Sequence, residues 1–187
     1  MSIEKKDMSN EEIIAACRKG DARAQKLLFN TFGPKLYAVC NRYSNSEESA
    51  QDMLQDGFVK IFEKLVSYKG EGSFEGWMRR IMVNTCLDEL RRSKKHQNNV
   101  DIDDYSYSLS NYETVLDELA AQDLLKILQV LPIGYRTVFN LYVIEGYSHK
   151  EIAEELEITV STSKSQFSRA KAILRDIIDK QKIGYES

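Results

Sequence analysis

The chain has 187 residues, with 26 Lys and Arg against 29 Asp and Glu, which gives a formal net charge of −3 at pH 7. This length accommodates one domain or two small ones, and the slight acidity excludes a histone-like protein that coats DNA indiscriminately. With only 9 Gly and 2 Pro, long stretches of the chain should be helical.

The first part of the chain predicts two helices. Ser9 or Asn10 can cap a helix that Gly20 ends, and Asp21 can cap the next one. Gly33-Pro34 is expected to break or kink the second helix, because proline lacks an N–H and clashes with the preceding turn.

The strongest helical pattern covers residues 47–66, and Ser44 can cap it. A loop containing glycines follows at residues 69–73, and Ser73 can cap a further helix that runs to about residue 92. The core-facing residues of the first of these helices recur at helical steps. They are Ala50, Met53, Leu54, Gly57, Phe58, Ile61, Phe62 and Leu65.

Residues 96–112 have no hydrophobic period and are polar and acidic, which is typical of a linker. A helix over about residues 113–130 follows, Pro132 suits the first turn of the next helix, and Gly146 closes that one. No segment alternates with period two for long enough to form a strand. The sequence therefore predicts an all-α fold of two small helical domains, residues 1–95 and 113–187, joined by a flexible linker.

The end of the chain predicts a helix-turn-helix. Ser148 and Glu151 form a capping box for one helix, and Thr159 can cap the next after a four-residue connection. The second helix has one apolar stripe and a polar, cationic outer face, which suits the major groove of DNA. The stripe is Ser163, Phe167, Ala170, Leu174 and Ile177, and the outer face is Thr162, Lys164, Ser165, Gln166, Ser168, Arg169 and Lys171.

The same residues also fit a plain helical hairpin with a solvated basic face. Glu157 stands where such turns often carry glycine, because a left-handed conformation is costly for residues with a Cβ.

Cys17, Cys40 and Cys86 are far apart and each lies in an apolar helical pattern, so we expect reduced, buried thiols of a cytosolic protein. No metal site and no cofactor is predicted. The charged N-terminus and the lack of a long apolar run predict no export signal and no membrane insertion.

Cationic and amide side chains gather on the helix that carries Trp77. Such groups suit the binding of single-stranded nucleic acid, and the loop before this helix could hold an unstacked base. The alternative is that Trp77 is ordinary core and the arginines are a solvated face. The polar residues concerned are Arg79, Arg80, Asn84, Asp88, Arg91 and Arg92.

An enzyme is not predicted. Asp52 and Asp56 could be imagined as metal ligands together with Asp88 and Glu89, but carboxylates on the outer face of a helix are usually only solvated. His149, like His96, has no evident triad partner, and there is no Gly-rich phosphate loop.

Both halves of the chain resemble one family. Residues 52–62, 74–84 and 88–92 are similar to conserved region 2 of bacterial sigma factors, and Leu131-Pro132 through Arg169-Ala170 are similar to region 4. With no recognisable region 1 or 3, the chain resembles an extracytoplasmic-function (ECF) sigma factor of the sigma-70 family.

This resemblance implies a subunit that binds core RNA polymerase and directs promoter-specific initiation by recognising and melting DNA. By similarity, the domain of residues 1–95 docks on polymerase and captures the minus-ten element, and residues 113–187 read the minus-thirty-five element. The polymerase-binding residues would be Asp52, Gln55, Asp56 and Phe58. The minus-ten residues would be Lys69, Gly70, Ser73, Trp77, Arg79, Arg80, Asn84, Asp88, Arg91 and Arg92. The helix-turn-helix residues would be Ser148, Lys150, Thr162, Lys164, Ser165, Gln166 and Arg169.

The expected partners are core RNA polymerase, promoter DNA and an anti-sigma factor, with no small-molecule substrate. The main rival is a helix-turn-helix regulator that binds operator DNA as a dimer without polymerase. Such a regulator would have no use for a surface that captures single strands.

Overall fold

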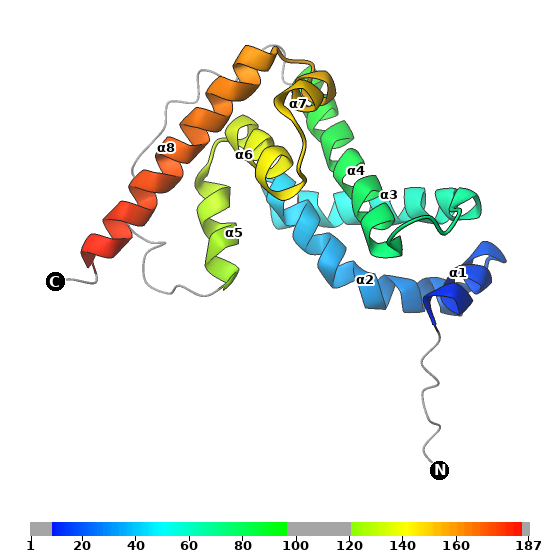
Figure 1. Cartoon of the computed structure of the whole chain (residues 1–187). Helices are drawn as coiled ribbons and strands as arrows, with labels where there is room; N and C mark the ends of the chain where they lie inside the picture. The colour runs from blue at the N-terminus through cyan, green and yellow to red at the C-terminus, as the bar shows by residue number, and fades with distance from the viewer. Residues whose placement is uncertain (1–8, 97–120, 185–187) are drawn as a thin grey trace. The chain divides into compact units, whose positions relative to one another are not determined.

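The computed structural model describes residues 9–96 and 121–184, and every element within these residues is helical, as predicted. Figure 1 labels the α-helices in chain order. The elements are α1 (Asn10–Arg18), α2 (Ala22–Tyr43), α3 (Glu47–Lys64), the 3₁₀ turn η1 (Leu65–Ser67), α4 (Phe74–His96), α5 (Ala121–Val130), α6 (Ile133–Phe139), the π-helical turn η4 (Asn140–Ile144), α7 (His149–Leu156) and α8 (Val160–Gly184).

Contacts divide the described residues into two compact units. The first contains the residues up to Cys40 together with Glu48–Cys86, and the second contains Asn41–Glu47 together with the residues from Leu87 onward. Most of the predicted linker and the predicted helix start near residue 113 lie outside the described residues. No helix in the described ranges is long and apolar enough to cross a membrane.

The first unit begins with two capped helices, as the sequence predicts. Ser9 forms a capping box with Glu12 at the start of α1, and the Asp21 carboxylate accepts from the N–H groups of Arg23 and Ala24 at the start of α2. Capping of this kind satisfies donors that have no partner inside the helix. The three thiols of this unit, Cys17, Cys40 and Cys86, are buried, as predicted, and none of them forms a disulfide.

The expected break at Gly33-Pro34 is wrong, because α2 is one element with Pro34 inside it. A proline in a helix removes one hydrogen bond, which leaves the carbonyl four residues earlier without its donor. Here that residue is Asn30, and both Asn30 and Pro34 are exposed. The freed carbonyl therefore lies on the solvent side, where water can replace the lost donor.

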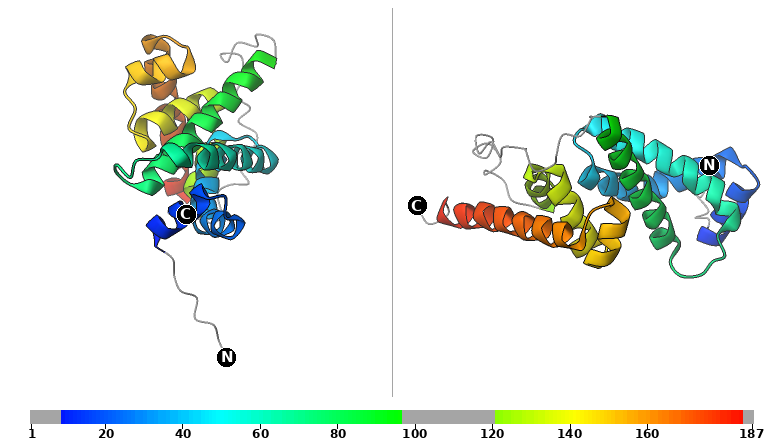
Figure 2. Two further views of the ribbon diagram at one scale, coloured as in Figure 1. Left: turned by 90° about the vertical axis from the view of Figure 1, so that its right-hand side faces the viewer. Right: turned by 90° about the horizontal axis from the view of Figure 1, so that it is seen from above.

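Helices α3 and α4 of the first unit approach closely at Gly57. A Cβ at this position would lie 2.4 Å from both Cε and Sδ of Met82, which is itself fully buried. A larger residue at this position would force the end of the buried Met82 side chain to move, so glycine allows the close approach of these two helices. The loop between η1 and α4 projects beyond the start of α4 (Figure 2).

The second unit has its apolar core between α5, α6 and α8. Leu128, Leu131 and Ala170 are buried there, and Tyr135, Phe139, Ile144, Ile173 and Leu174 pack against them. The sequence predicted one ordinary helix up to Gly146, but the structure changes from α6 to the π-helical turn η4 at Asn140. Such turns are rare and often occur at functional sites.

A buried polar network in the second unit links α6 and η4 to the segment Asn41–Glu47. The guanidinium of Arg136, which is only 2% exposed, donates to the Ser44 carbonyl at 2.9 Å and to Asn45 Oδ1 at 2.6 Å. Asn140 Nδ2 donates to the Arg42 carbonyl at 2.9 Å, and Arg42 forms an ion pair with Glu145. Burial lowers the pKa of Arg136 to about 10. No sequence pattern predicts this network, because its hydrogen bonds join residues that lie 91 or more positions apart.

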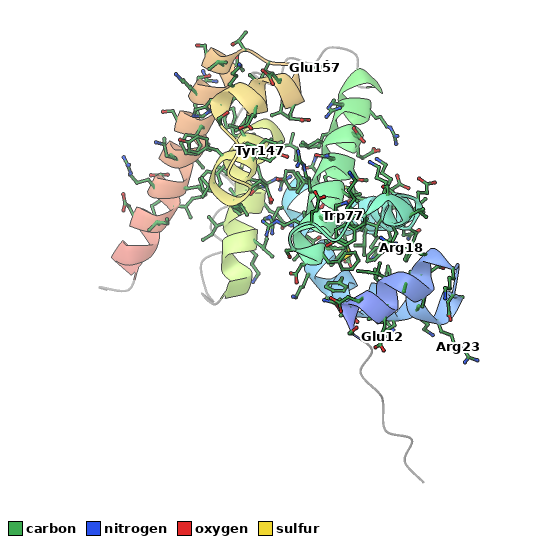
Figure 3. The ribbon with its side chains drawn as sticks, turned by 45° about the vertical axis from the view of Figure 1, so that its right-hand side comes forward. Glu12, Arg18, Arg23, Trp77, Tyr147 and Glu157 are labelled. Carbon is green, nitrogen blue, oxygen red and sulfur yellow. The ribbon has the colours of Figure 1, made fainter. Side chains whose placement is uncertain are left out.

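The helix-turn-helix forms where the sequence predicts it. Ser148 and Glu151 make the capping box of α7, and the Thr159 hydroxyl accepts from the Thr162 N–H at the start of α8. Glu157 ends α7 in the left-handed region, with φ 54° and ψ 44°. Figure 3 labels this residue at the turn.

We expect Glu157→Gly to stabilise the second unit by about 0.5–1 kcal/mol. The substitution removes a left-handed penalty of about 1–2 kcal/mol, partly offset by the greater backbone freedom of glycine when unfolded. Thermal unfolding measures the change. Glu154→Gly, at an exposed position inside α7, is the matched control and should destabilise by about 1 kcal/mol. Equal losses from both substitutions would contradict strain at Glu157.

Candidate nucleic-acid interface

An aromatic cluster lies beside the loop that precedes α4. The Trp77 ring lies 4.9 Å from the Tyr68 ring and 5.8 Å from the Phe74 ring, measured between centroids. Tyr68 and Phe74 are buried, whereas Trp77 is only half-buried. Trp77 therefore packs against core residues while part of its side chain stays accessible, and its contact with single-stranded DNA stays a prediction.

The loop itself has the backbone freedom that its glycines predict. Gly70 and Gly72 have φ of +79° and +77°, and a Cβ on either would meet no other atom. The requirement for glycine here is therefore conformational and not one of space. The Tyr68 hydroxyl donates to the Gly72 carbonyl at 3.3 Å, and Ser73 Oγ accepts from the Gly76 N–H in the first turn of α4.

Several predicted minus-ten residues of the first unit are exposed around this loop. Lys69, Gly70 and Ser73 are exposed in the loop, and Arg80 and Asn84 are exposed on α4. Trp77 and Arg79 are at intermediate exposure. The surface thus combines three cationic side chains, an amide and part of an aromatic cluster, which are groups suited to single-stranded nucleic acid.

The remaining three predicted minus-ten residues lie in the second unit, where carboxylates surround the arginines. Arg91 contacts Asp88 at 3.3 Å and Glu155 at 3.2 Å, and Arg92 lies 3.7 Å from Glu89. The contact with Glu155 was not predicted, because this residue is 64 residues from Arg91 in the sequence. These ion pairs reduce the positive charge that Arg91 and Arg92 can offer to phosphates.

The outer face of α3 carries most of the predicted polymerase-binding residues. Asp52, Gln55 and Asp56 are exposed, as expected of a docking surface. Phe58 is 3% exposed and its ring lies 4.6 Å from that of Phe29, as its place on the core-facing side predicts, and its role in polymerase binding stays a prediction. No cluster of three metal-ligating side chains occurs among the described residues.

The predicted recognition helix α8 presents a cationic outer face. Lys164, Ser165 and Arg169 are exposed and Thr162 is partly exposed. Arg169 donates to the Tyr135 hydroxyl at 2.9 Å, which restricts the position of its guanidinium. On α7, Lys150 is exposed, whereas Ser148 is occupied by its cap.

Gln166 does not lie on this outer face, so that expectation is wrong. Gln166 is only 7% exposed, and it follows the buried Ser163 by three residues and precedes the buried Ala170 by four. Positions three and four apart share one side of a helix. Gln166 therefore belongs to the face of α8 that packs inward.

His149 joins α7 to α8 through the buried Ser163. Its Nδ1 lies 2.9 Å from Ser163 Oγ, and its ring stacks on Tyr142 at 4.5 Å and meets Phe167 edge-on at 5.7 Å. Desolvation, and secondarily Lys164, lower the pKa of His149, which favours the neutral imidazole that can accept from the hydroxyl. This role could not be predicted from the sequence, since only a tertiary contact reveals it.

Comparison with known proteins supports the two-part organisation. Residues 28–96 match the family model Sigma-70 region 2, and residues 121–174 match Sigma-70, region 4.

Individual relatives match along most of the chain. The chain is 27% identical to the ECF RNA polymerase sigma-E factor of Haemophilus influenzae over 91% of its own length and 96% of that protein. It is 30% identical to the ECF RNA polymerase sigma factor SigM of Mycobacterium tuberculosis over 92% of its own length and 86% of that protein. Among solved structures, the sigma factor RpoE in complex with the anti-sigma factor NepR from Bartonella quintana has a TM-score of 0.49 at 22% identity, covering 82% of this chain and 96% of that one. The two regional matches and the relatives together show that this chain belongs to the ECF RNA polymerase sigma factors of the sigma-70 family.

Proposed function

We propose that this sigma factor binds core RNA polymerase in the cytoplasm and directs promoter-specific initiation through two DNA contacts. The loop at residues 69–73, the aromatic cluster beside it and α4 would capture unpaired bases of the minus-ten element. Helix α8 would read the minus-thirty-five element as duplex DNA. The main observation in support is that one chain carries a half-buried Trp77 beside a glycine loop and, separately, a capped helix-turn-helix with exposed Lys164 and Arg169.

The energetics explain why both contacts are needed. Opening DNA costs about 1.4 kcal/mol for each stacked step, whereas stacking one base on an aromatic side chain returns about 1–3 kcal/mol. Capture of a few bases can therefore offset local melting. A contact from α8 to a base edge adds about 1–3 kcal/mol of discrimination when it is bidentate, and lysines near phosphates add affinity that depends on salt.

Polymerase supplies what the isolated chain lacks. With a net charge of −3, and with Arg91 and Arg92 next to carboxylates, the free protein as a whole attracts duplex DNA weakly, although α8 carries a cationic face. The exposed carboxylates Asp52 and Asp56 lie one turn apart on α3 and provide an acidic docking face for the polymerase. An anti-sigma factor is the further partner that we propose.

Run-off transcription tests this function. Core RNA polymerase should produce a specific transcript from the DNA upstream of this gene only when the chain is added. In a pull-down, joint replacement Asp52→Ala and Asp56→Ala should weaken core binding at least about tenfold, roughly 1.4 kcal/mol. Asp179→Ala removes an exposed carboxylate of α8 outside both family matches and should leave binding unchanged.

Three outcomes would oppose the proposal. Tight, specific binding of promoter duplex by the isolated chain would favour an independent regulator. Absence of a transcript would contradict the initiation role, and equal effects of the α3 and Asp179 variants would contradict the docking face.

A further inference from the structure

Arg18, the last residue of α1, binds the turn η1, which leads into the loop at residues 69–73. Its Nε donates to the Leu65 carbonyl at 3.1 Å, and its Nη2 donates to the Tyr68 carbonyl. These are the first residue of η1 and the residue that caps it. Because the guanidinium is planar and its donors are fixed relative to each other, binding two carbonyls sets the distance and direction between them.

The helix that carries Arg18 is firmly placed in the first unit. Ile13, Ile14 and Cys17 are buried, and the capping box of Ser9 and Glu12 fixes the start of α1. Arg18 is thus attached to a rigid base rather than to a loop. This helix lies before the matched Sigma-70 region 2, which begins at residue 28. The family match therefore does not include the residue that supports the loop.

Tyr68 connects this support to the proposed site of base capture. Its ring lies 4.9 Å from that of Trp77 and 5.2 Å from that of Phe74, and its hydroxyl donates to the Gly72 carbonyl. Holding the Tyr68 carbonyl therefore fixes both the aromatic cluster and the start of the loop. Beyond Tyr68, the two glycines with positive φ have space around them and give the loop little stiffness of its own.

We propose that Arg18 is a positioning residue for single-strand capture, which orders η1 and the loop at residues 69–73 so that an unstacked base fits against Trp77. This inference rests on the proposed function. If the loop were disordered before binding, the entropy cost of ordering it would reduce the affinity for DNA. A loop that Arg18 already holds in place has a smaller entropy cost on binding. Arg18 acts here through backbone carbonyls and needs no contact with DNA.

The substitution Arg18→Lys separates positioning from charge. Lysine keeps the positive charge near the loop, but its single ammonium on a flexible stem cannot reproduce the fork to two carbonyls. Arg23→Lys is the matched control, because Arg23 is an exposed arginine at the start of α2 and extends outward, as Figure 3 shows. If charge alone mattered, both lysine variants would behave like the wild type.

The experiment uses holoenzyme assembled from core polymerase and the full chain. The probe is a fluorescent single-stranded oligonucleotide that carries the non-template minus-ten sequence of the promoter identified by run-off transcription. We expect Arg18→Lys to bind this oligonucleotide about tenfold more weakly, with core affinity and minus-thirty-five duplex binding unchanged. Hydrogen exchange of the free chain should show faster exchange at residues 69–73 in Arg18→Lys, but not in Arg23→Lys.

The outcomes separate this inference from the function on which it rests. If wild-type holoenzyme does not bind the oligonucleotide, the proposed function fails, and the role of Arg18 fails with it. If the wild type binds and Arg18→Lys binds equally well, only the role of Arg18 is overturned. Equal weakening of single-strand, duplex and core binding by Arg18→Lys would show a general folding role and would also overturn the inference.

Discussion

Arg136→Ala should destabilise the second unit by about 3–5 kcal/mol. The side chain is 2% exposed and donates to the carbonyls of Ser44 and Gln129 and to Asn45 Oδ1. Its removal leaves an empty volume and deprives the buried Ser44 carbonyl and two part-buried acceptors of their donor, and each lost hydrogen bond to a charged group is worth about 1.5–3 kcal/mol. The cost of burying a guanidinium, visible in its pKa of about 10, offsets part of that loss.

Thermal and urea unfolding of the full chain measure this effect, and we expect the melting temperature to fall by about 10 °C. Arg136→Met tests the cause, because methionine fills most of the volume but cannot donate. Its cost should be about 1–3 kcal/mol, the part due to unsatisfied acceptors. Arg175→Ala, at an exposed site on α8, is the control and should stay within about 0.5 kcal/mol of the wild type. A loss for Arg136→Ala no larger than this control would refute the network.

Gly57→Val should destabilise the first unit by about 3 kcal/mol. The new Cβ alone would lie 2.4 Å from Cε and Sδ of Met82, and the valine methyl groups add further volume. The Met82 side chain is flexible, but it is fully buried, with Met78 and Cys86 fully buried beside it, so it has no open space into which to move. Inserting methyl groups into a packed core costs about 1–3 kcal/mol and occasionally more.

The control for this substitution is another glycine inside a helix. A Cβ at Gly76 in α4 would lie 3.6 Å from the Ser73 Cβ, which is ordinary van der Waals contact. Gly76→Ala should therefore stabilise α4 by about 1 kcal/mol through helix propensity alone. Urea unfolding should also show that Met82→Ala reduces the cost of Gly57→Val, with a coupling of about 1–3 kcal/mol. Additive effects of the two substitutions would contradict a direct clash.

The features that the sequence predicted well are those set by neighbouring residues. The sequence predicts a cap at Ser9 or Asn10, a capping box of Ser148 with Glu151 and a cap at Thr159, and in the structure Ser9, Ser148 and Thr159 are the capping residues. The turn at Glu157 was predicted to need a left-handed residue, and its φ of 54° confirms this. Local hydrogen bonding and steric rules act over such distances, so the sequence suffices.

The features that the sequence could not predict depend on tertiary packing. Arg136 and Ser44 are 92 residues apart, and nothing in the pattern around either indicates that they meet. The π-helical turn and the inward position of Gln166 depend on how α6, α7 and α8 pack. Of the candidate site, the loop and the exposed face of α4 were predictable from composition. The support by Arg18 was not, because it is a contact across 47 residues.

The π-helical turn limits how this part of the chain tolerates changes in length. A π turn holds more residues than an α turn, and each additional residue rotates the following side chains by about 100° around the axis. In η4, Tyr142 faces His149 and Phe167, which brace α7 and α8 against each other. Removing one residue between Asn140 and Ile144 would restore a regular helix, but it would rotate the Tyr142 ring away from His149 and Phe167. The packing of α7 against α8 therefore depends on the number of residues in this turn as much as on their chemical nature, and we expect insertions or deletions there to be poorly tolerated.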